Sequence, residues 1–215
     1  MTAARRRMRE AAIRLFAEKG STQVSMSELA QAAGVARGTA HNNLESPDAF
    51  FREIASELAD EMNDRITISS EGVADPTRRL AFAIRFYVRR AHEEPDWGRF
   101  LLRFAISEQA LQAFWLGQPV QDLLNGQESG AFDFRIDQTP SAISFIAGSV
   151  LGAILLVLDG HRTWRDAGRD AVEFALRALG VPEQAARDLA VSELPLLREL
   201  PSPPSRMRKS GSALA

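Results

Sequence analysis

The chain of 215 residues has no cysteine and only three histidines. Without cysteine it can form neither a disulfide framework nor a thiolate metal site, and it has no cysteine nucleophile. None of the histidines, His41, His92 and His161, has an acid placed at a spacing that a helix would make useful for catalysis. Clusters of ligands as dense as a metal sensor requires are also missing. We therefore expect no enzymatic activity, no bound metal and no cofactor.

A long apolar run is also missing after the basic N-terminus, because Arg14, Glu18 and Lys19 interrupt every candidate signal-peptide core. Together with the absence of cysteine, this favours a protein kept in the reducing cytoplasm. Hydrophobic residues make up 45% of the chain and charged residues 25%, which is typical of a soluble protein with a packed core. The length allows one large domain or two small ones.

No strong excess of one charge is present, since the formal net charge is −2. The distribution is uneven, however. Up to Leu44 the acidic residues are Glu10, Glu18 and Glu28, whereas the basic residues are Arg5, Arg6, Arg7, Arg9, Arg14, Lys19 and Arg37. One end of the chain therefore carries a positive face, which is either a solvated arginine-rich arm or a surface for nucleic acid.

Strand-like alternation is absent too, and helical periodicity extends along the chain. We predict an all-α fold with an N-terminal domain over 1–46, a ligand-binding and dimerisation domain over 47–200, and a disordered tail over 201–215. A connecting helix over 47–69 opens the second domain, because Ser46, Pro47 and Asp48 form a helix start. Further helices are expected from Asp75 to about Glu94, from Asp96 toward Ser107, over 108–132 with an interruption near Gly117 to Pro119, from Thr139-Pro140 through the apolar run 142–158, over 167–179 and over about 182–194.

The segment "SELAQAAGVARGTAHNNL", residues 27–44, contains two short helices separated by a glycine. Ser25 and Glu28 form a capping box at the first helix, and Gly34 ends it. The second helix, from about Ala36 to Leu44, carries hydrogen-bonding side chains and almost no acid, unlike an ordinary surface helix. This pattern is typical of a three-helix helix-turn-helix domain that inserts its last helix into the major groove.

Several residues of this segment are candidates for contacting DNA. Arg37 can bind guanine through two hydrogen bonds, and Asn42 or Asn43 can match adenine. Ser25 and Ser27 can hold a phosphate with the amides of their helix. The full set of candidate DNA-binding residues is Ser25, Ser27, Arg37, Gly38, Thr39, His41, Asn42 and Asn43.

The run from Ala142 to Leu158 contains no charge, which raises the question of a membrane span. At 17 residues, with glycines and serines inside and acids at both ends, it lies at the lower limit for spanning. A helix buried on both sides, in the core and at a subunit interface, is the better interpretation. We expect no membrane insertion, and a two-fold dimer built on the helices near 140–158 and 167–179, with Leu151 and Leu155 at the interface.

The stretch from Arg9 to Phe51 resembles the DNA-binding domain of the TetR family of transcriptional regulators. The resemblance rests on AA..LF...G followed by S....LA..AGV..GT in the same register. In that family Leu-Tyr usually follows Gly-Thr, a Phe ends the third helix, and a lysine starts the fourth. Here these positions are Ala40, His41, Leu44 and Pro47. The family's tyrosine and lysine are typically phosphate contacts, so only the arginine-rich arm offers an evident substitute.

The resemblance implies a homodimeric transcriptional regulator, by family default a repressor, that leaves a palindromic double-stranded DNA operator when a small-molecule effector enters the helical bundle. The bundle is rich in aromatic residues with few polar side chains among them, which favours a hydrophobic or aromatic effector. The candidate effector-binding residues are Phe82, Phe86, Phe104, Trp115 and Phe145. A helical protein-interaction module without sequence-specific DNA binding is the alternative.

Overall fold

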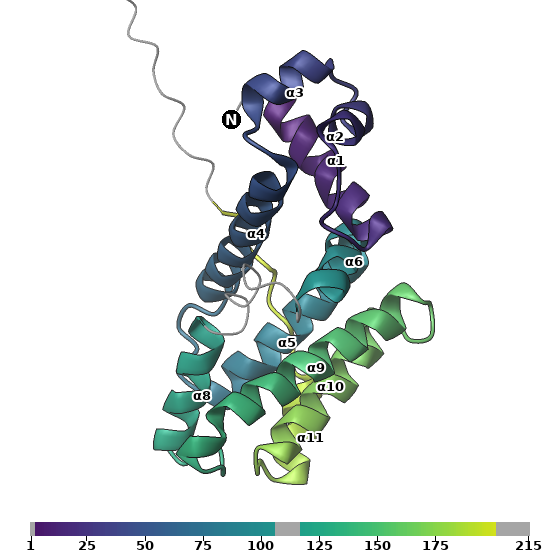
Figure 1. The fold of residues 1–215 in the computed structure, drawn as a ribbon. Coiled ribbons are helices and arrows are strands. Elements are labelled where there is room, and N and C mark those ends of the chain that lie inside the picture. The colour runs from purple at the N-terminus through teal and green to yellow at the C-terminus, as the bar shows by residue number, and fades with distance from the viewer. Residues whose placement is uncertain (1–2, 106–116, 201–215) are drawn as a thin grey trace, which may run out of the picture.

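The computed structural model describes residues 3–105 and 117–200, and within these ranges every regular element is a helix (Figure 1). The predicted all-α fold is therefore confirmed. The helices are α1 (Ala3–Lys19), α2 (Met26–Ala32), α3 (Arg37–Asn43), α4 (Pro47–Ser69), α5 (Pro76–Glu93), α6 (Pro95–Phe104), α8 (Gln118–Glu128), α9 (Thr139–Leu158), α10 (Trp164–Ala178) and α11 (Glu183–Val191), with a short 3-10 turn η2 (Ile136–Gln138) before α9. Trp115 and the tail over 201–215 lie outside the described residues.

Helices α1 to α3 form a head with a small apolar core at one end of the molecule (Figure 1). Phe16 of α1 and Leu29 of α2 are fully buried in it, and Ala40 of α3 is buried against them. Each large side chain removed from water in this way contributes about 1.5–3 kcal/mol. The head is small, so its core depends on these few residues.

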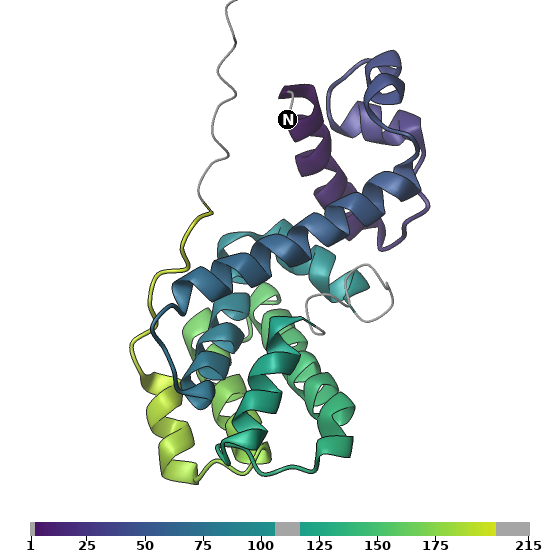
Figure 2. The same ribbon diagram turned by 90° about the vertical axis from the view of Figure 1, so that its left-hand side faces the viewer.

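Helix α4 leads from the head along the bundle (Figure 2). Its first turn follows the sequence signal closely, because the Ser46 hydroxyl accepts a hydrogen bond from the Ala49 amide at 3.1 Å and Pro47 occupies the first turn. Along its length Phe51, Ile54 and Leu58 are buried. The predicted connecting helix over 47–69 is thus present with those bounds.

The bundle is organised around α5, which packs against α6, α8, α9, α10 and α11. Because neighbours surround it, α5 buries residues on most of its circumference, including Phe86 and Arg90. Helix α10 begins three residues before the predicted start at 167, since Thr163 caps it by accepting from the Asp166 amide at 3.2 Å.

Helix α9 is the one described helix long and apolar enough to cross a membrane, with a mean hydropathy of 2.3 over its most apolar 18-residue window. It packs against α5, α6, α8 and α10, and Val150 and Ile154 are buried there. Only 39% of the apolar window is buried, however. The opposite side of α9 faces outward within a single chain, and Phe145 and Leu155 are each 48% exposed there.

The expected equivalence of Leu151 and Leu155 is not seen. Leu151 is only 7% exposed and belongs to the bundle core, whereas Leu155 lies on the outer side of α9. Four residues correspond to about 400° around a helix. The two positions therefore lie near the boundary between the inner and outer faces, and the packing of α5 and α10 decides which of them is covered.

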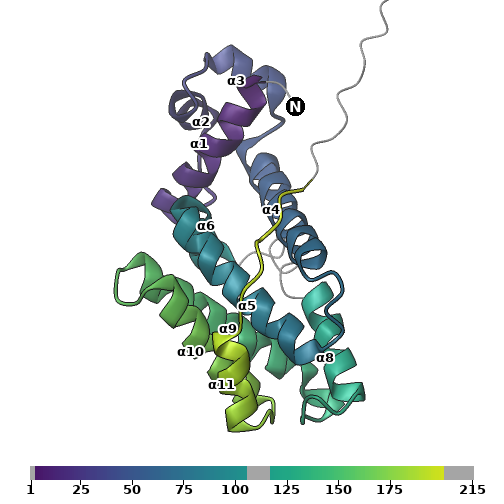
Figure 3. The same cartoon turned by 180° about the vertical axis from the view of Figure 1, so that it is seen from behind.

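After α11 the chain runs in an extended form over residues 192–200, the C-terminal strap, which passes α5 and reaches α4 (Figure 3). The helix expected over 182–194 is shorter than predicted, because α11 ends at Val191. Ser192 is extended, with φ −56° and ψ 155°, and its hydroxyl donates to the Leu189 carbonyl at 2.7 Å. Pro195 then follows in the chain, and the residue before a proline is biased away from the helical region.

Candidate DNA-binding site

The start of α2 is fixed by a hydrogen-bonded group around the Glu28 carboxylate. Glu28 accepts from the Ser25 amide and hydroxyl, both at 2.8 Å, and from Lys19 Nζ at 2.7 Å, while its own amide donates to the Ser25 hydroxyl at 3.2 Å. The Lys19 ammonium and the Ser25 donors lower the pKa of Glu28 to about 2. The interaction therefore stabilises the head above the carboxyl's ordinary pKa and is lost as the pH falls toward 2.

This capping box engages Ser25, one of the two serines predicted to contact DNA. Ser25 has its amide and its hydroxyl engaged with Glu28, whereas Ser27, in the first turn of α2, is exposed. Of the two serines, Ser27 is the one that is exposed and whose hydroxyl is not hydrogen-bonded to Glu28.

The turn between α2 and α3 depends on Gly34. Its φ of +61° is a left-handed conformation that residues with a Cβ rarely adopt. The Gly34 amide donates to the Gln31 carbonyl at 3.1 Å, and the Val35 amide donates to the Ala30 carbonyl at 3.0 Å, so the last carbonyls of α2 are satisfied as the chain reverses. The tight turn sets the angle at which α3 leaves α2.

Helix α3 has one small buried residue and an exposed polar face. Ala40 is fully buried and holds α3 against the head, while Arg37, Gly38, His41 and Asn42 are exposed. No acid lies within α3. Space is open around Gly38, where an added Cβ would meet nothing within 4 Å. The face is slim, polar and free of negative charge.

Two of the predicted α3 contacts are half-buried and linked to each other. The Asn43 side-chain amide donates to the Thr39 carbonyl at 2.7 Å, and the Asn43 carbonyl accepts from Arg5 Nη1 at 2.9 Å. Asn43 therefore stabilises the last turn of α3 and links that helix to α1. Of the two asparagines, Asn42 projects outward.

The arginine-rich N-terminus is not a free arm, because α1 already begins at Ala3. Arg5 forms an ion pair with Glu53 of α4, and Arg9 binds Glu57 of α4 at 3.2 Å. Arg5 and Arg9 thus hold α1 against the connecting helix. The exposed arginines of α1 are Arg6, Arg7 and Arg14.

An aromatic cluster joins the head to the bundle, and the sequence analysis does not single it out. Phe51 of α4 has its ring centroid 5.0 Å from Phe16 of α1, 5.4 Å from Phe100 and 5.0 Å from Phe104 of α6. Such ring pairs contribute about 0.5–1.5 kcal/mol beyond burial. Phe104, a predicted effector contact, therefore packs at the junction between head and bundle. The adjacent residues Phe50 and Phe51 are a sequence signal for this junction. Neighbouring residues of a helix cannot both face the same side, so two large apolar residues in a row indicate that α4 is packed on two sides here.

A charged junction lies beside this cluster and consists of Arg9, Glu61, Arg65, Arg90 and Glu94. Glu61 of α4 binds Arg90 of α5 at 2.8 Å, Arg65 at 3.5 Å and Arg9 of α1 at 3.5 Å. Arg90 is 3% exposed and also stacks on Trp97 at 4.7 Å from the ring centroid. A movement of α5 or α6 would therefore act on α1 and α4 together.

The five predicted effector-binding residues are not brought into one place. Phe82 and Phe86 of α5 are buried, with ring centroids 6.3 Å apart, and Phe104 lies at the junction described above. Phe145 points outward from α9 and is 48% exposed, and Trp115 lies outside the described residues.

Phe145 instead belongs to an apolar outer face of α9 and α10. Its members are Phe145, Leu155 and Leu156 of α9 and Phe174 of α10, between 41% and 60% exposed. Gly148 and Gly152 lie on the same side of α9, and a Cβ on either would meet nothing within 4 Å. Phe174 is not among the predicted interface residues, although it falls outside the inner face formed by Ala171, Val172, Ala175 and Leu176.

Comparison with known families decides what this arrangement is. A family described as "Bacterial regulatory proteins, tetR family" matches residues 9–54, and one described as "Tetracyclin repressor-like, C-terminal domain" matches residues 75–192, more than half of the chain. The chain belongs to the TetR family. This TetR-family protein is therefore a DNA-binding transcriptional regulator, and such regulators are generally not enzymes.

Among its relatives, the HTH-type transcriptional regulator BetI of Rhizobium meliloti is 27% identical over 92 residues, which are 43% of this chain. The match spans 45% of BetI, slightly less than half of its length.

Solved structures match over a greater length. RolR in complex with resorcinol is 25% identical, with a TM-score of 0.69, 91% of this chain covered and 96% of that one. A TetR-family regulator from Shewanella sp. PV-4 has a TM-score of 0.72 at 20% identity, covering 83% and 98%. FadR of Bacillus subtilis, in complex with stearoyl-CoA, has a TM-score of 0.65 at 18% identity, covering 81% and 96%.

Proposed function

We propose that this TetR-family regulator is a homodimeric repressor in the cytoplasm that binds a palindromic operator and is released by a small hydrophobic or aromatic ligand. The observation that carries the proposal is the outer face of α3, where Arg37, His41 and Asn42 are exposed and no acid is present. Such a face can offer donors and acceptors to base edges without repelling the phosphates.

The contacts divide between reading and positioning. Arg37 and Asn42 read bases, since an arginine matches guanine and an asparagine matches adenine through paired hydrogen bonds. Ser27, Thr39 and His41 contact the backbone, and Arg6 and Arg7 add charge that is independent of sequence. Ser25, Asn43 and Gly38 support this surface: the first two hold the ends of α2 and α3, and the third keeps α3 slim.

A second copy of the chain covers the apolar outer face of α9 and α10. An exposed apolar patch of this kind marks an interaction surface, and the two glycines of α9 let a partner helix approach closely. A two-fold axis through this face places two α3 helices in one assembly. For binding they must lie about 34–36 Å apart, or a multiple of this distance, so that each meets a major groove on the same side of the DNA.

The effector acts through the junction between head and bundle. RolR is described in complex with resorcinol and FadR with stearoyl-CoA, and both ligands have a large apolar or aromatic part. For this chain we place the effector beside α5, near Phe82 and Phe86, with Phe104 relaying its effect to Phe51 of α4. The dimer has one conformation whose head spacing fits the operator and another whose spacing does not. The ligand releases the DNA if its affinity for the second conformation is higher than its affinity for the first.

A gel-shift titration of the protein on the DNA upstream of its own gene, with a shuffled sequence of equal length, tests the proposal. We expect the upstream DNA to bind at least a thousandfold more tightly, as specific binding typically exceeds non-specific binding by about 10³–10⁷. A helical interaction module would bind both sequences equally weakly. The same complex, challenged with resorcinol and with stearoyl-CoA, then shows which class of effector releases it.

A further inference from the structure

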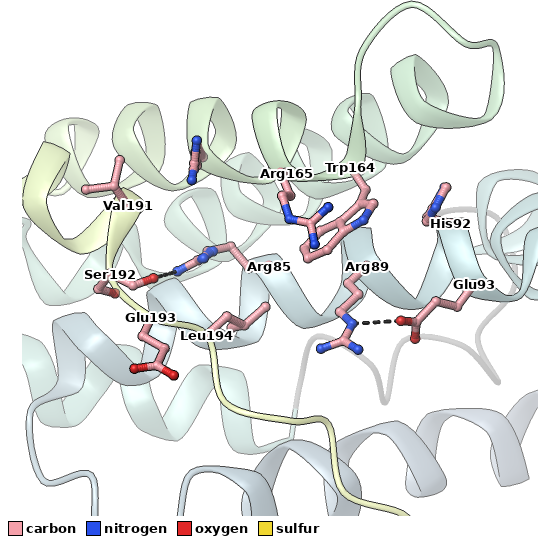
Figure 4. A pocket seen from close by; sticks show the side chains of 11 residues that line it. Arg85, Arg89, His92, Glu93, Trp164, Arg165, Val191, Ser192, Glu193 and Leu194 are labelled. Carbon is pink, nitrogen blue, oxygen red and sulfur yellow. Dashed lines mark hydrogen bonds and ion pairs between the residues drawn. The ribbon is translucent and has the colours of Figure 1, made fainter.

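A cavity of about 460 Å³ lies between α5, α10 and the beginning of the C-terminal strap (Figure 4). Its volume falls within the roughly 300–1,000 Å³ of small-molecule pockets. It is lined by Arg85, Arg89, His92, Glu93, Trp164, Arg165, Arg169 and residues 191–194.

Positive charge dominates this cavity, because four arginines line it against two carboxylates. Arg89 is neutralised by Glu93, which accepts from its Nε at 2.8 Å. Arg165 and Arg169 form no ion pair with any residue in the ranges 3–105 and 117–200, and the remaining carboxylate, Glu193, forms none there either. Arg85 and the exposed Arg165 and Arg169 therefore have no carboxylate partner of their own within those ranges.

Arg85 is the most enclosed of these arginines, at 8% exposed. Burial, together with the neighbouring Arg169, lowers its pKa below the ordinary value, so its positive charge is held at a cost in free energy. Its Nη1 donates to the Ser192 carbonyl at 2.7 Å. This is the one hydrogen bond of its side chain within the described residues, which leaves further donors for an anion.

An aromatic surface lies beside the charge. The Trp164 ring is half-buried, and the guanidinium carbons of Arg165 and Arg89 lie 4.5 Å and 5.6 Å from its centroid (Figure 4). Val191, which is 60% exposed, and Leu194 add apolar wall. A ligand that fills this volume needs both an anionic group and an apolar body.

We propose that this cavity is a second ligand site, separate from the α5 interior, that binds a small organic anion, a carboxylate or a phosphate carrying an aromatic or aliphatic body. The anionic group lies among Arg85, Arg165 and Arg169, since guanidinium groups bind both carboxylates and phosphates through paired hydrogen bonds. The body lies against Trp164.

The wall of this site is mechanically connected to the helix that carries the head. The strap starts at Ser192, held by Arg85, and ends on α4, where the Arg198 carbonyl accepts from Arg65 Nε at 3.0 Å and the Arg198 amide donates to the Ser69 hydroxyl at 2.8 Å. An anion that accepts hydrogen bonds from Arg85 changes the hydrogen bond between Arg85 and the Ser192 carbonyl. The change reaches the end of α4 through the strap. The regulatory consequence rests on the function proposed above, whereas binding of the anion does not.

Calorimetric titration of the full-length protein with 1-naphthoate, 1-naphthyl phosphate, 2-naphthol and inorganic phosphate tests the site. We expect the two naphthyl anions to bind and Arg165→Gln/Arg169→Gln to weaken them at least tenfold. Arg78→Gln, an exposed arginine of α5 outside the cavity, is the matched control and should change neither affinity. A preference between the two anions tells carboxylate from phosphate ligands.

The proposal is overturned if the anions fail to bind at millimolar concentration, if the double variant binds them as the wild type does, or if 2-naphthol or inorganic phosphate binds equally well. Hydrogen exchange without DNA tests the connection: 1-naphthoate should change the exchange of amides over 192–200 and 64–70 in the wild type and not in the double variant. Exchange that changes only elsewhere contradicts the link to α4. Both measurements are made without DNA, so they test the site even if no operator is found.

Discussion

Helices α3 and α9 each expose a face that an ordinary soluble helix would not, and the two faces are opposite in chemistry. On α3 the exposed residues include Arg37, His41 and Asn42, with no acid. On α9 they include Phe145, Leu155 and Leu156, with no charge. Neither face is explained by the packing of the single chain.

The difference indicates two different partners. A hydrogen-bonding face without acids suits DNA, which is polar and negative, while an apolar face with open glycines suits a protein surface like itself. The helices are also held differently. Helix α3 is anchored by few residues, with Ala40 buried and Asn43 held by Arg5, whereas α9 packs on four other helices. A substitution on the outer face of α9 is therefore expected to break the proposed dimer without unfolding the chain, whereas one in its core should also unfold it.

The largest effect is expected from Leu155→Glu on the apolar face. A charge there opposes dimer formation, so light scattering should show monomers with unchanged helical circular dichroism. Operator affinity should fall by about three orders of magnitude, because one half-site is no longer bound and the remainder approaches non-specific binding. Leu196→Glu is the matched control, since Leu196 is 74% exposed and lies in the strap. A wild type that is already monomeric at micromolar concentration contradicts the dimer.

Leu151→Glu introduces a charge on the inner face of the same helix. Leu151 is 7% exposed in the bundle core, so a buried charge there should lower the free energy of unfolding by several kcal/mol. This variant should therefore lose the stability of the chain itself, and not only the second subunit. Urea denaturation separates the two cases: Leu155→Glu should retain a cooperative transition, and Leu151→Glu should unfold at much lower urea. Similar stabilities would mean that the inner and outer faces of α9 are assigned incorrectly.

A smaller loss is expected from Arg37→Ala on α3. It should cost about 1–3 kcal/mol on the operator and relax the preference at one base position. Fluorescence anisotropy on the operator and on single-base variants measures both. If affinity for random DNA falls by the same factor, Arg37 contacts phosphate rather than a base.

The basic residues of α1 should separate into two groups. Arg6→Gln/Arg7→Gln should weaken operator and random DNA alike and reduce the slope of log affinity against log salt by roughly one unit for each phosphate that these arginines neutralise. Arg5→Gln removes the ion pair to Glu53 and the hydrogen bond to the Asn43 carbonyl, so it should lower stability by about 1 kcal/mol. Equal salt slopes for the wild type and the Arg6/Arg7 variant would show that these arginines do not reach DNA.

The smallest effect concerns His41. It is exposed on α3. Histidine gains a positive charge between about pH 8 and pH 5, and a nearby phosphate favours the charged form. Affinity for the operator should therefore rise a few-fold from pH 8 to pH 6 and fall again as the pH increases, at constant ionic strength. In His41→Gln the rise should disappear; parallel curves would show that His41 takes up no proton on binding.

Local signals predict much of the fold and part of the candidate site. The capping box at Ser25, the turn at Gly34 and the start of α4 at Ser46 and Pro47 are visible in the sequence because each depends on neighbours within four residues. The start of α10 and the end of α11 differ from the predicted bounds by a few residues, since Thr163 and Ser192 act through particular hydrogen bonds.

Short-range sequence patterns are enough to predict that the chain is helical, that its first quarter is a helix-turn-helix head, and that α3 presents polar side chains without acids. These properties follow from periodicity and from interactions between residues close in the chain. Long-range packing, in contrast, is the reason that Arg5 and Arg9 hold α1 to α4, that Phe104 packs on Phe51, and that Phe145 faces outward. Those outcomes depend on residues far apart in the chain, and on which side of each helix its neighbours cover, which periodicity alone does not specify.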